Sequence, residues 1–140
     1  MNMTIYRIIP YSNYKLCLAI NPFMENIKLG VYPAFNSDRS LWKIKSNPTM
    51  INNYCHQDYG LKVHESEGNI IGVRAGLVSP DDTKCHFYMT KISNNIYTLQ
   101  VAKDIRKLLS YDKNRGLLLN HSDDGKIDMN NDLWIFTQKP

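Results

Sequence analysis

The two tryptophans of this 140-residue chain lie 92 residues apart in matching surroundings. Trp42 lies in SDRSLWKI and Trp134 in NNDLWIFT, so each follows polar residues and a leucine and precedes an apolar residue. Two further pairs of segments keep nearly this offset, namely IYRI at 5–8 with IYTL at 96–99, and KLCL at 15–18 with KLLS at 107–110. Three features in one order at one offset indicate an internal repeat, which constrains the fold more than any local pattern does.

This offset leaves room for a middle copy at about half the distance. The segment NIKLGVYP at 26–33 is matched by NIIGVRAG at 69–76, which begins 43 residues later. The middle copy carries Phe87 where the other two carry tryptophan. We therefore divide the chain into three repeats of about 45 residues. Their approximate bounds are 4–47, 48–93 and 94–140.

Each repeat contains short segments rich in β-branched and aromatic residues, such as TIYRIIPY and NIKLGVY, separated by turn-forming residues such as NSD and SPDD. This pattern is typical of short antiparallel strands, four in each repeat. The segment LQVAKDIRKLL at 99–109 also fits an amphipathic helix, with Val101, Ile105 and Leu108 on one side. Its place in the repeat favours a strand and a loop.

Twelve short strands in three copies must close on themselves or leave sheet edges exposed. A six-stranded barrel capped by three hairpins, the β-trefoil, meets this requirement. The predicted fold class is therefore all-β. The last strand of each repeat would carry an apolar anchor into the core, and we expect these anchors to be Trp42, Phe87 and Trp134.

Composition excludes several classes of protein. The content of 43% hydrophobic and 21% charged residues is that of a globular chain. The net charge of +4 is spread over the sequence, and the basic cluster at 103–107 is too thin for a nucleic-acid partner. No stretch approaches the ~18 apolar residues of a membrane span, so we expect no membrane insertion. The N-terminus carries no signal peptide pattern. We therefore expect the protein to be cytoplasmic, or released without a conventional signal peptide.

The three cysteines are an odd set at wide spacing, which allows one disulfide but no disulfide framework. The dipeptides Cys55-His56 and Cys85-His86 invite a zinc interpretation. Adjacent residues of a strand point to opposite faces, however, and no CxxC or HxxxH spacing supports a metal. Buried strand cysteines are the better interpretation.

The segment SDDGKID at 122–128 is weakly similar to a calcium-binding loop. It lacks the alternating ligands and the final bidentate glutamate of such a loop, so we predict a hairpin turn around Asp124-Gly125. The chain has no phosphate-binding or nucleophile motif of the kind that marks common enzymes. We expect no catalysis, no cofactor and no metal.

Each repeat resembles that of the ricin-B-type (R-type) lectins, above all their intracellular or haemagglutinin-type fungal and bacterial members. The family repeat has a strand centred on leucine, a second strand of Ile-Ile-Gly-aromatic type, and a polar pair shortly before a tryptophan. The matching segments are KLCLAI, IKLGVY and DRSLW in repeat one, GLKVHE, NIIGVR and KCHFY in repeat two, and KLLSYD, GLLLNH and NNDLW in repeat three. The segment KLLSYDKNRG is also similar to the small haemagglutinin subunits of clostridial toxin complexes.

The resemblance implies a sugar site built from an acid after the leucine strand, a ring from the next strand and the polar pair before the tryptophan. Carboxylates and amides bind vicinal hydroxyls, and a ring covers the apolar face of the pyranose. In repeat three the residues that this pattern implies as carbohydrate-binding are Ser110, Asp112, His121, Asn131 and Asp132.

The other repeats depart further from the family pattern. In repeat one Ala19 takes the place of the acid, while Tyr32 can serve as the ring and Asp38-Arg39 as the polar pair. In repeat two the three places are taken by Val63, Arg74 and Lys84-Cys85. Repeat three therefore keeps the most chemistry suited to a sugar, and repeat two the least.

The resemblance implies a lectin for galactose-type or N-acetylgalactosamine-type glycans, acting through repeat three and also repeat one. Shallow single sites of this kind bind weakly, so two sites or a homo-oligomer would supply avidity. The alternative is a protein-interaction module, either a protease inhibitor or a subunit of a haemagglutinin or toxin complex that binds no sugar. The missing acids in repeats one and two favour this alternative. The expected partners are glycans or glycoproteins, with a protein partner left open.

Overall fold

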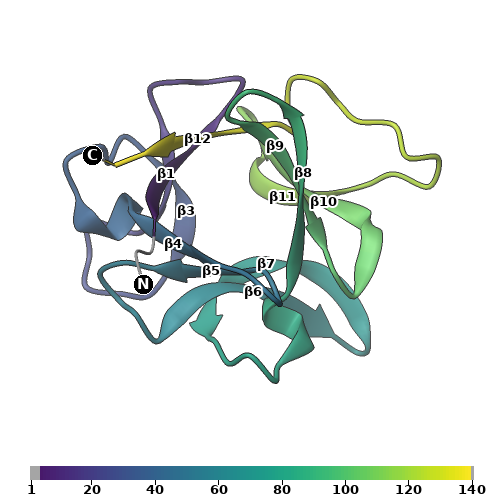
Figure 1. The fold of residues 1–140 in the computed structure, drawn as a ribbon, viewed down its shortest axis with the longest axis horizontal. Coiled ribbons are helices and arrows are strands. Elements are labelled where there is room, and N and C mark those ends of the chain that lie inside the picture. Colours follow the sequence, from purple (N-terminus) through teal and green to yellow (C-terminus); the bar gives the residue numbers. More distant parts are fainter. Residues whose placement is uncertain (1–3, 140) are drawn as a thin grey trace.

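The computed structural model describes residues 4–139, which form twelve strands and two short 3-10 turns (Figure 1). The elements of the first repeat are β1 (Ile5–Pro10), β2 (Cys17–Ile20), β3 (Leu29–Tyr32), η1 (Asp38–Ser40) and β4 (Trp42–Lys45). Those of the second are β5 (Met50–Asn53), β6 (Tyr59–Ser66), β7 (Asn69–Leu77), η2 (Thr83–Cys85) and β8 (Phe87–Ser93). Those of the third are β9 (Ile96–Val101), β10 (Asp104–Asp112), β11 (Gly116–His121) and β12 (Trp134–Gln138).

The first and last strands of each repeat form a closed barrel, which Figure 1 shows end-on. Strand β1 pairs with β12 and β4, β4 pairs with β5, and β9 pairs with β12 and β8, all antiparallel. The ring closes between β5 and β8, where the Phe87 N–H donates to the Thr49 carbonyl at 3.1 Å. Closure removes the exposed edges that an open sheet would present.

The remaining strands form one hairpin in each repeat, β2–β3, β6–β7 and β10–β11. Strand β11 contacts both β7 and β3, so the three hairpins meet. The predicted all-β fold, with four strands in each of three repeats, is confirmed.

The two tryptophans anchor equivalent strands to the core. Both are fully buried, and each indole N–H donates to a backbone carbonyl, Trp42 to Leu18 at 2.9 Å and Trp134 to Leu109 at 2.8 Å. In the second repeat the buried Phe87 fills the corresponding place without an N–H. Each tryptophan therefore ties the last strand of its repeat to the second strand, with its only polar atom satisfied.

The segment 99–109 forms the end of β9, a turn at 102–103 and the first part of β10, so the helix alternative is wrong. Leu99 and Val101 are both fully buried, which is the period of two expected of a strand. The backbone of β9 is paired on both sides, by β8 and β12. These long-range pairings outweigh the weak local helical pattern.

All three cysteines are free, so no disulfide forms between them. Cys17 and Cys85 are buried, and burial raises the pKa of both thiols. Cys55 is exposed, and the prediction of a buried strand cysteine is wrong there because β5 ends at Asn53. Cys85 lies in the 3-10 turn η2 rather than in a strand. In residues 4–139 no helix has the length and apolar character to cross a membrane.

Removing the indole hydrogen bond of Trp134 should lower the stability of the protein. Trp134→Phe keeps a ring in the core but leaves the buried Leu109 carbonyl without a donor, and we expect a loss of about 2 kcal/mol in the free energy of unfolding. Urea unfolding followed by circular dichroism measures this loss. The exposed Tyr88→Phe is the control, with an expected change of at most about 0.5 kcal/mol. Equal unfolding midpoints for Trp134→Phe and wild type would contradict the anchor.

Candidate functional site

The chain between β11 and β12 leaves the barrel as a long loop, olive to yellow at the upper right of Figure 1. It borders a shallow, open hollow of about 550 Å³ lined by residues 120–124, 126–128 and Asp132. We call this the loop hollow. It lies just before the Trp134 anchor, beside the predicted polar pair Asn131-Asp132.

Asp132 forms the floor of the loop hollow and is 1% exposed. Its carboxylate accepts hydrogen bonds from the Ser110 hydroxyl, from Asn120 Nδ2 at 3.1 Å and from the Asp128 N–H at 2.8 Å. Burial of a carboxylate is costly unless donors satisfy it. Here the donors come from β10, from β11 and from the loop itself, so one side chain holds together the three segments around the hollow.

Asp128 fixes the return of the loop to the barrel. Its carboxylate accepts the N–H groups of Asn130 at 2.9 Å and Asn131 at 3.2 Å, and its carbonyl accepts the Asp132 N–H at 2.9 Å. Side-chain acceptors of this kind define a tight turn. Short-range hydrogen bonds therefore hold residues 128–132, the C-terminal part of the loop, in a tight turn.

The predicted hairpin around Asp124-Gly125 is wrong. A turn does form there, with the Lys126 N–H donating to Asp124 Oδ1 at 3.1 Å and Gly125 at φ +75°. Only glycine adopts this left-handed conformation freely. The turn joins no paired strands, because β11 pairs with β10 while β12 pairs with β1 and β9.

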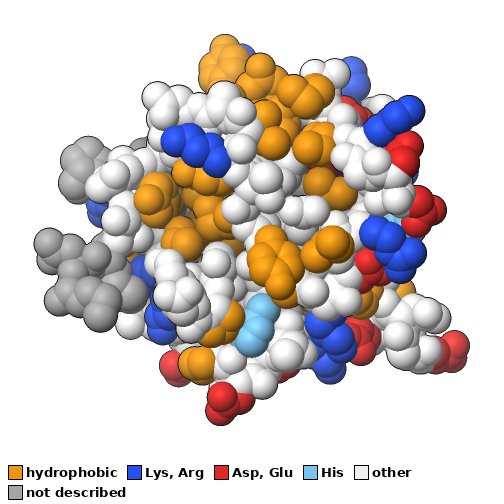
Figure 2. All heavy atoms as spheres, turned by 45° about the vertical axis from the view of Figure 1, so that its right-hand side comes forward, with side chains coloured by type: hydrophobic (Ala, Val, Ile, Leu, Met, Phe, Trp, Pro, Cys, Tyr) orange, Lys and Arg blue, Asp and Glu red, His pale blue; other side chains and the backbone are white. Residues whose placement is uncertain are grey.

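Charged side chains form the rim of the loop hollow. His121 Nε2 lies 2.7 Å from Asp123 Oδ1, and Arg106 Nη1 lies 3.5 Å from the same oxygen. The side chains of His121 and Asp123 are 41% and 74% exposed, so both can reach a ligand. Figure 2 brings this side of the molecule forward, and acidic and basic side chains alternate along its right-hand edge.

The structure divides the five predicted residues of repeat three between two places. His121 and Asp132 line the loop hollow, and Ser110 lies buried beneath it against Asp132. Asp112 and Asn131 line a separate hollow of about 240 Å³. Asn131 and Asp132 therefore line different hollows, although the sequence predicts them as one polar pair.

Asp112 closes the turn between β10 and β11. Its carboxylate accepts the Asn114 N–H at 2.8 Å and the Arg115 N–H at 3.3 Å. The hydrogen bond from the Asn114 N–H holds the pKa of the Asp112 carboxyl below its usual value. One carboxylate oxygen of Asp112 is thus already bound by backbone N–H groups of the turn.

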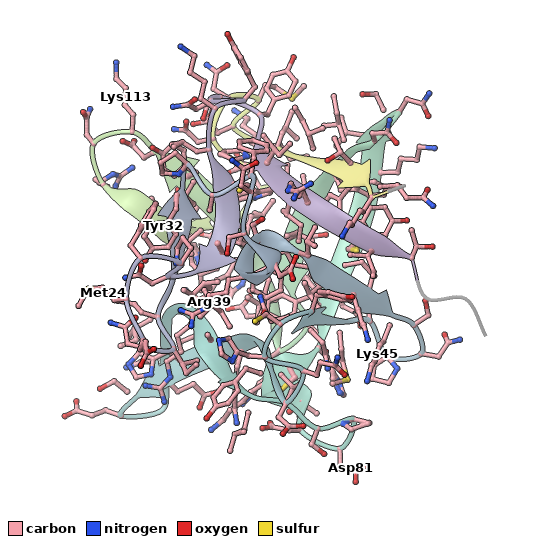
Figure 3. All side chains as sticks on the ribbon, turned by 90° about the vertical axis from the view of Figure 1, so that its left-hand side faces the viewer. Met24, Tyr32, Arg39, Lys45, Asp81 and Lys113 are labelled. Atoms are coloured by element: carbon pink, nitrogen blue, oxygen red, sulfur yellow. The ribbon has the colours of Figure 1, made fainter. Side chains whose placement is uncertain are left out.

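The predicted residues of repeat one have intramolecular roles. Tyr32 packs edge-on against Phe23, with ring centroids 6.1 Å apart, and burial raises its pKa. Arg39 Nη1 donates to the carbonyls of Asn21 at 2.7 Å and Met24 at 2.8 Å. Figure 3 shows Tyr32, Met24 and Arg39 on the same side of the molecule. Asp38 is exposed at the start of η1.

Counting back from the aromatic anchors corrects the predicted polar pair of repeat one. The residue two places before each anchor is buried in every repeat, and these residues are Ser40, Cys85 and Asp132. The counterpart of Asn131-Asp132 is therefore Arg39-Ser40, one residue later than the predicted Asp38-Arg39. Only the third repeat has a carboxylate in the buried place.

Strand register also corrects the acid position of repeat two. Leu18, Leu61 and Leu109 face Val31, Ala75 and Leu119 in the three hairpins. The residue after each leucine is Ala19, Lys62 or Ser110, so Lys62 holds the place that the family pattern gave to Val63. Val63 instead packs in the core. A shift of one residue turns a strand side chain to the opposite face.

Sequence reasoning missed Asn120 and Asp128, which complete the floor of the loop hollow with Asp132. For Asp128 the available signal was the insertion SDDGKIDMNN at 122–131, while Asn120 lies before it in β11. Among residues 4–139, no group of three or more His, Cys, Asp or Glu side chains is placed to hold a metal ion.

No family model and no curated protein matches this sequence. Solved structures do match. A mosquitocidal holotoxin aligns with a TM-score of 0.80 at 15% identity over 100% of this chain, although the chain spans only 18% of the holotoxin. The Rhizoctonia solani agglutinin aligns with a TM-score of 0.73 at 11% identity, over 99% of this chain and 97% of that one.

The C-terminal domain of an earthworm lectin, a mutant in complex with 6'-sialyllactose, aligns with a TM-score of 0.67 at 13% identity over 97% of this chain and 99% of that one. The chain is a β-trefoil. These three matches, to part of a holotoxin, to an agglutinin and to a lectin domain, share this fold, so the resemblance to R-type lectins holds at the level of the fold. At such identities the comparison shows the trefoil fold alone, and any activity must be argued from the hollow itself.

The floor of the loop hollow predicts different costs for two adjacent residues. Asp132→Ala leaves the buried Ser110 hydroxyl and two partly buried donors without their acceptor, and we expect a loss of about 3 kcal/mol in the free energy of unfolding. Asn131→Ala, in the neighbouring surface hollow, should change it by at most about 0.5 kcal/mol. Urea unfolding of both variants checks the contrast. Equal stabilities would show that Asp132 does not hold the loop.

Proposed function

We propose that this trefoil binds carbohydrate without catalysis, and that the loop hollow of repeat three binds galactose-type or N-acetylgalactosamine-type glycans. The observation that supports this most strongly is that the hollow combines a buried, hydrogen-bonded floor with an exposed polar rim. A buried carboxylate, Asp132, fixes its floor, while polar side chains of the rim stay exposed. A preorganised floor reduces the conformational entropy lost on binding, which favours a weakly binding ligand such as a sugar.

The rim carries the chemistry that sugar recognition needs. Asp123 and Asp124 offer carboxylate oxygens, which accept hydrogen bonds from vicinal hydroxyls, and Lys126 offers a donor. The His121 ring and the Ile127 side chain, both lining the hollow, offer apolar surface for the face of a pyranose. The earthworm lectin domain that binds 6'-sialyllactose has the same fold, which supports the proposal by analogy.

Replacing rim residues tests this function without disturbing the floor. We expect wild-type protein to bind galactose-type or N-acetylgalactosamine-type glycans on an array. His121→Ala combined with Asp124→Ala should weaken this binding at least about tenfold, because it removes an apolar face and a carboxylate from the rim. The matched control is Lys45→Ala combined with Asp81→Ala, two surface residues outside the hollow, which should bind as wild type does. Isothermal titration with the preferred glycan gives the affinities.

Two results would contradict the proposal. One is the absence of wild-type binding to every glycan on a broad array. The other is unchanged affinity in the His121→Ala and Asp124→Ala variant, which would remove the loop hollow as the site.

A protein partner is the second candidate, and exposed apolar side chains favour it. Phe23 and Met24 are 67% and 61% exposed, on a loop that Arg39 holds in place through two backbone carbonyls. A solvated pair of this kind, fixed in position, suits a protein interface. The holotoxin, of which this chain spans 18%, is an example of a trefoil within a larger chain. Failure of all glycan binding would promote this candidate.

A further inference from the structure

A second hollow, of about 490 Å³, lies between repeats one and two. Repeat one contributes Ile27 to Leu29 at the start of β3, and repeat two contributes Lys62 of β6 and Arg74 to Leu77 of β7. We call it the cationic seam. In the described part of the chain it shares no lining residue with the loop hollow, so the two can be tested separately.

Three cations line the cationic seam, Lys28, Lys62 and Arg74, and none of its described lining residues is an aspartate or glutamate. Asp82 neutralises Lys62, with Oδ2 of the carboxylate 3.0 Å from Nζ. Within residues 4–139, neither Lys28 nor Arg74 takes part in an ion pair. Two uncompensated positive charges therefore face one hollow.

The placement of Arg74 is unfavourable for the protein alone. It lies directly opposite Lys62 in the β6–β7 pair, and like charges in opposite places destabilise a sheet. Lys62 turns away across Gly76, where a Cβ would come within 2.9 Å of Lys62 Cδ, and its Nζ donates to the Leu77 carbonyl at 3.1 Å. Among residues 4–139 Arg74 has no ion-pair partner of the kind that Asp82 gives Lys62, and an anion in the seam would supply one.

The walls of the cationic seam are apolar beside the charges. Ile27 and Leu77 are both exposed, and Leu29 and Ala75 are partly buried. Ligand sites commonly combine an apolar lining with a few charged groups that fix orientation, and this hollow has the usual size of about 300–1,000 Å³. A ligand that fits carries an anionic group next to an apolar face. A sulfated or carboxylated sugar has both.

We propose that the cationic seam binds the sulfate or carboxylate group of an acidic sugar. Arg74 and Lys28 bind the anion, and the apolar walls contact the sugar ring. The anion site follows from the charges of the seam alone. That its ligand is a sugar rests on the proposed function.

Titration of the purified chain with galactose 6-sulfate, N-acetylneuraminic acid, galactose and inorganic sulfate tests the proposal. We expect the two acidic sugars to bind wild-type protein, and Lys28→Glu combined with Arg74→Glu to weaken them at least about tenfold. The control is Lys45→Glu combined with Lys91→Glu, which makes the same change in net charge and should alter affinity less than about twofold. In Figure 3 Lys45 lies on the right and Met24 on the left, so Lys45 is well separated from the loop that carries Met24.

Equal weakening in both double variants would show non-specific attraction and overturn the site, as would full affinity in the Lys28→Glu and Arg74→Glu variant. The milder Lys28→Gln combined with Arg74→Gln must also weaken binding, which guards against an effect of misfolding. Inorganic sulfate that binds as tightly as galactose 6-sulfate would overturn the sugar assignment. The loop-hollow variant, His121→Ala with Asp124→Ala, should bind the acidic sugars normally even if it binds no neutral glycan. Loss of acidic-sugar binding there would move the ligand to the loop hollow and overturn the seam site.

Discussion

The buried indole of Trp134, which donates a hydrogen bond to the Leu109 carbonyl, anchors the last strand of this trefoil. It holds β12 against the core, and β12 pairs with both β1 and β9, so the first and last repeats are joined through it. Two residues earlier in the same segment, Asp132 binds the strands and loop around the hollow. One short segment therefore both closes the barrel and builds the candidate site.

The fold was predictable because its signals are local and repeated. Trp42 and Trp134 stand in the same sequence context, and the same burial and hydrogen bond follow in the structure. The site was less predictable, because it depends on single-residue register and on burial. Lys62 and Val63 differ by one place but face opposite ways, one toward a hollow and one into the core. Likewise the carboxylate of Asp132 is a group that could bind sugar hydroxyls. In the structure it accepts three internal hydrogen bonds instead, and so supports the hollow from below.

The three repeats keep one backbone plan and differ in how their loops are held. In repeat one, Arg39 donates to two loop carbonyls. In repeat two, Lys62 and Asp82 form an ion pair between β6 and the loop before β8. In repeat three, the Asp132 carboxylate accepts the N–H of Asp128 from the loop. A rigid barrel tolerates such differences because they lie on connecting segments. The result is a frame of near three-fold symmetry that carries three chemically distinct surfaces.

The most direct test of the central claim is an amide NMR titration of isotopically labelled protein with galactose and N-acetylgalactosamine. If the loop hollow is the carbohydrate site, the largest chemical-shift changes fall on residues 120–128, with the Trp134 indole signal in its folded position throughout. Changes confined to residues 21–28 of repeat one, or no changes at saturating sugar, would contradict the claim.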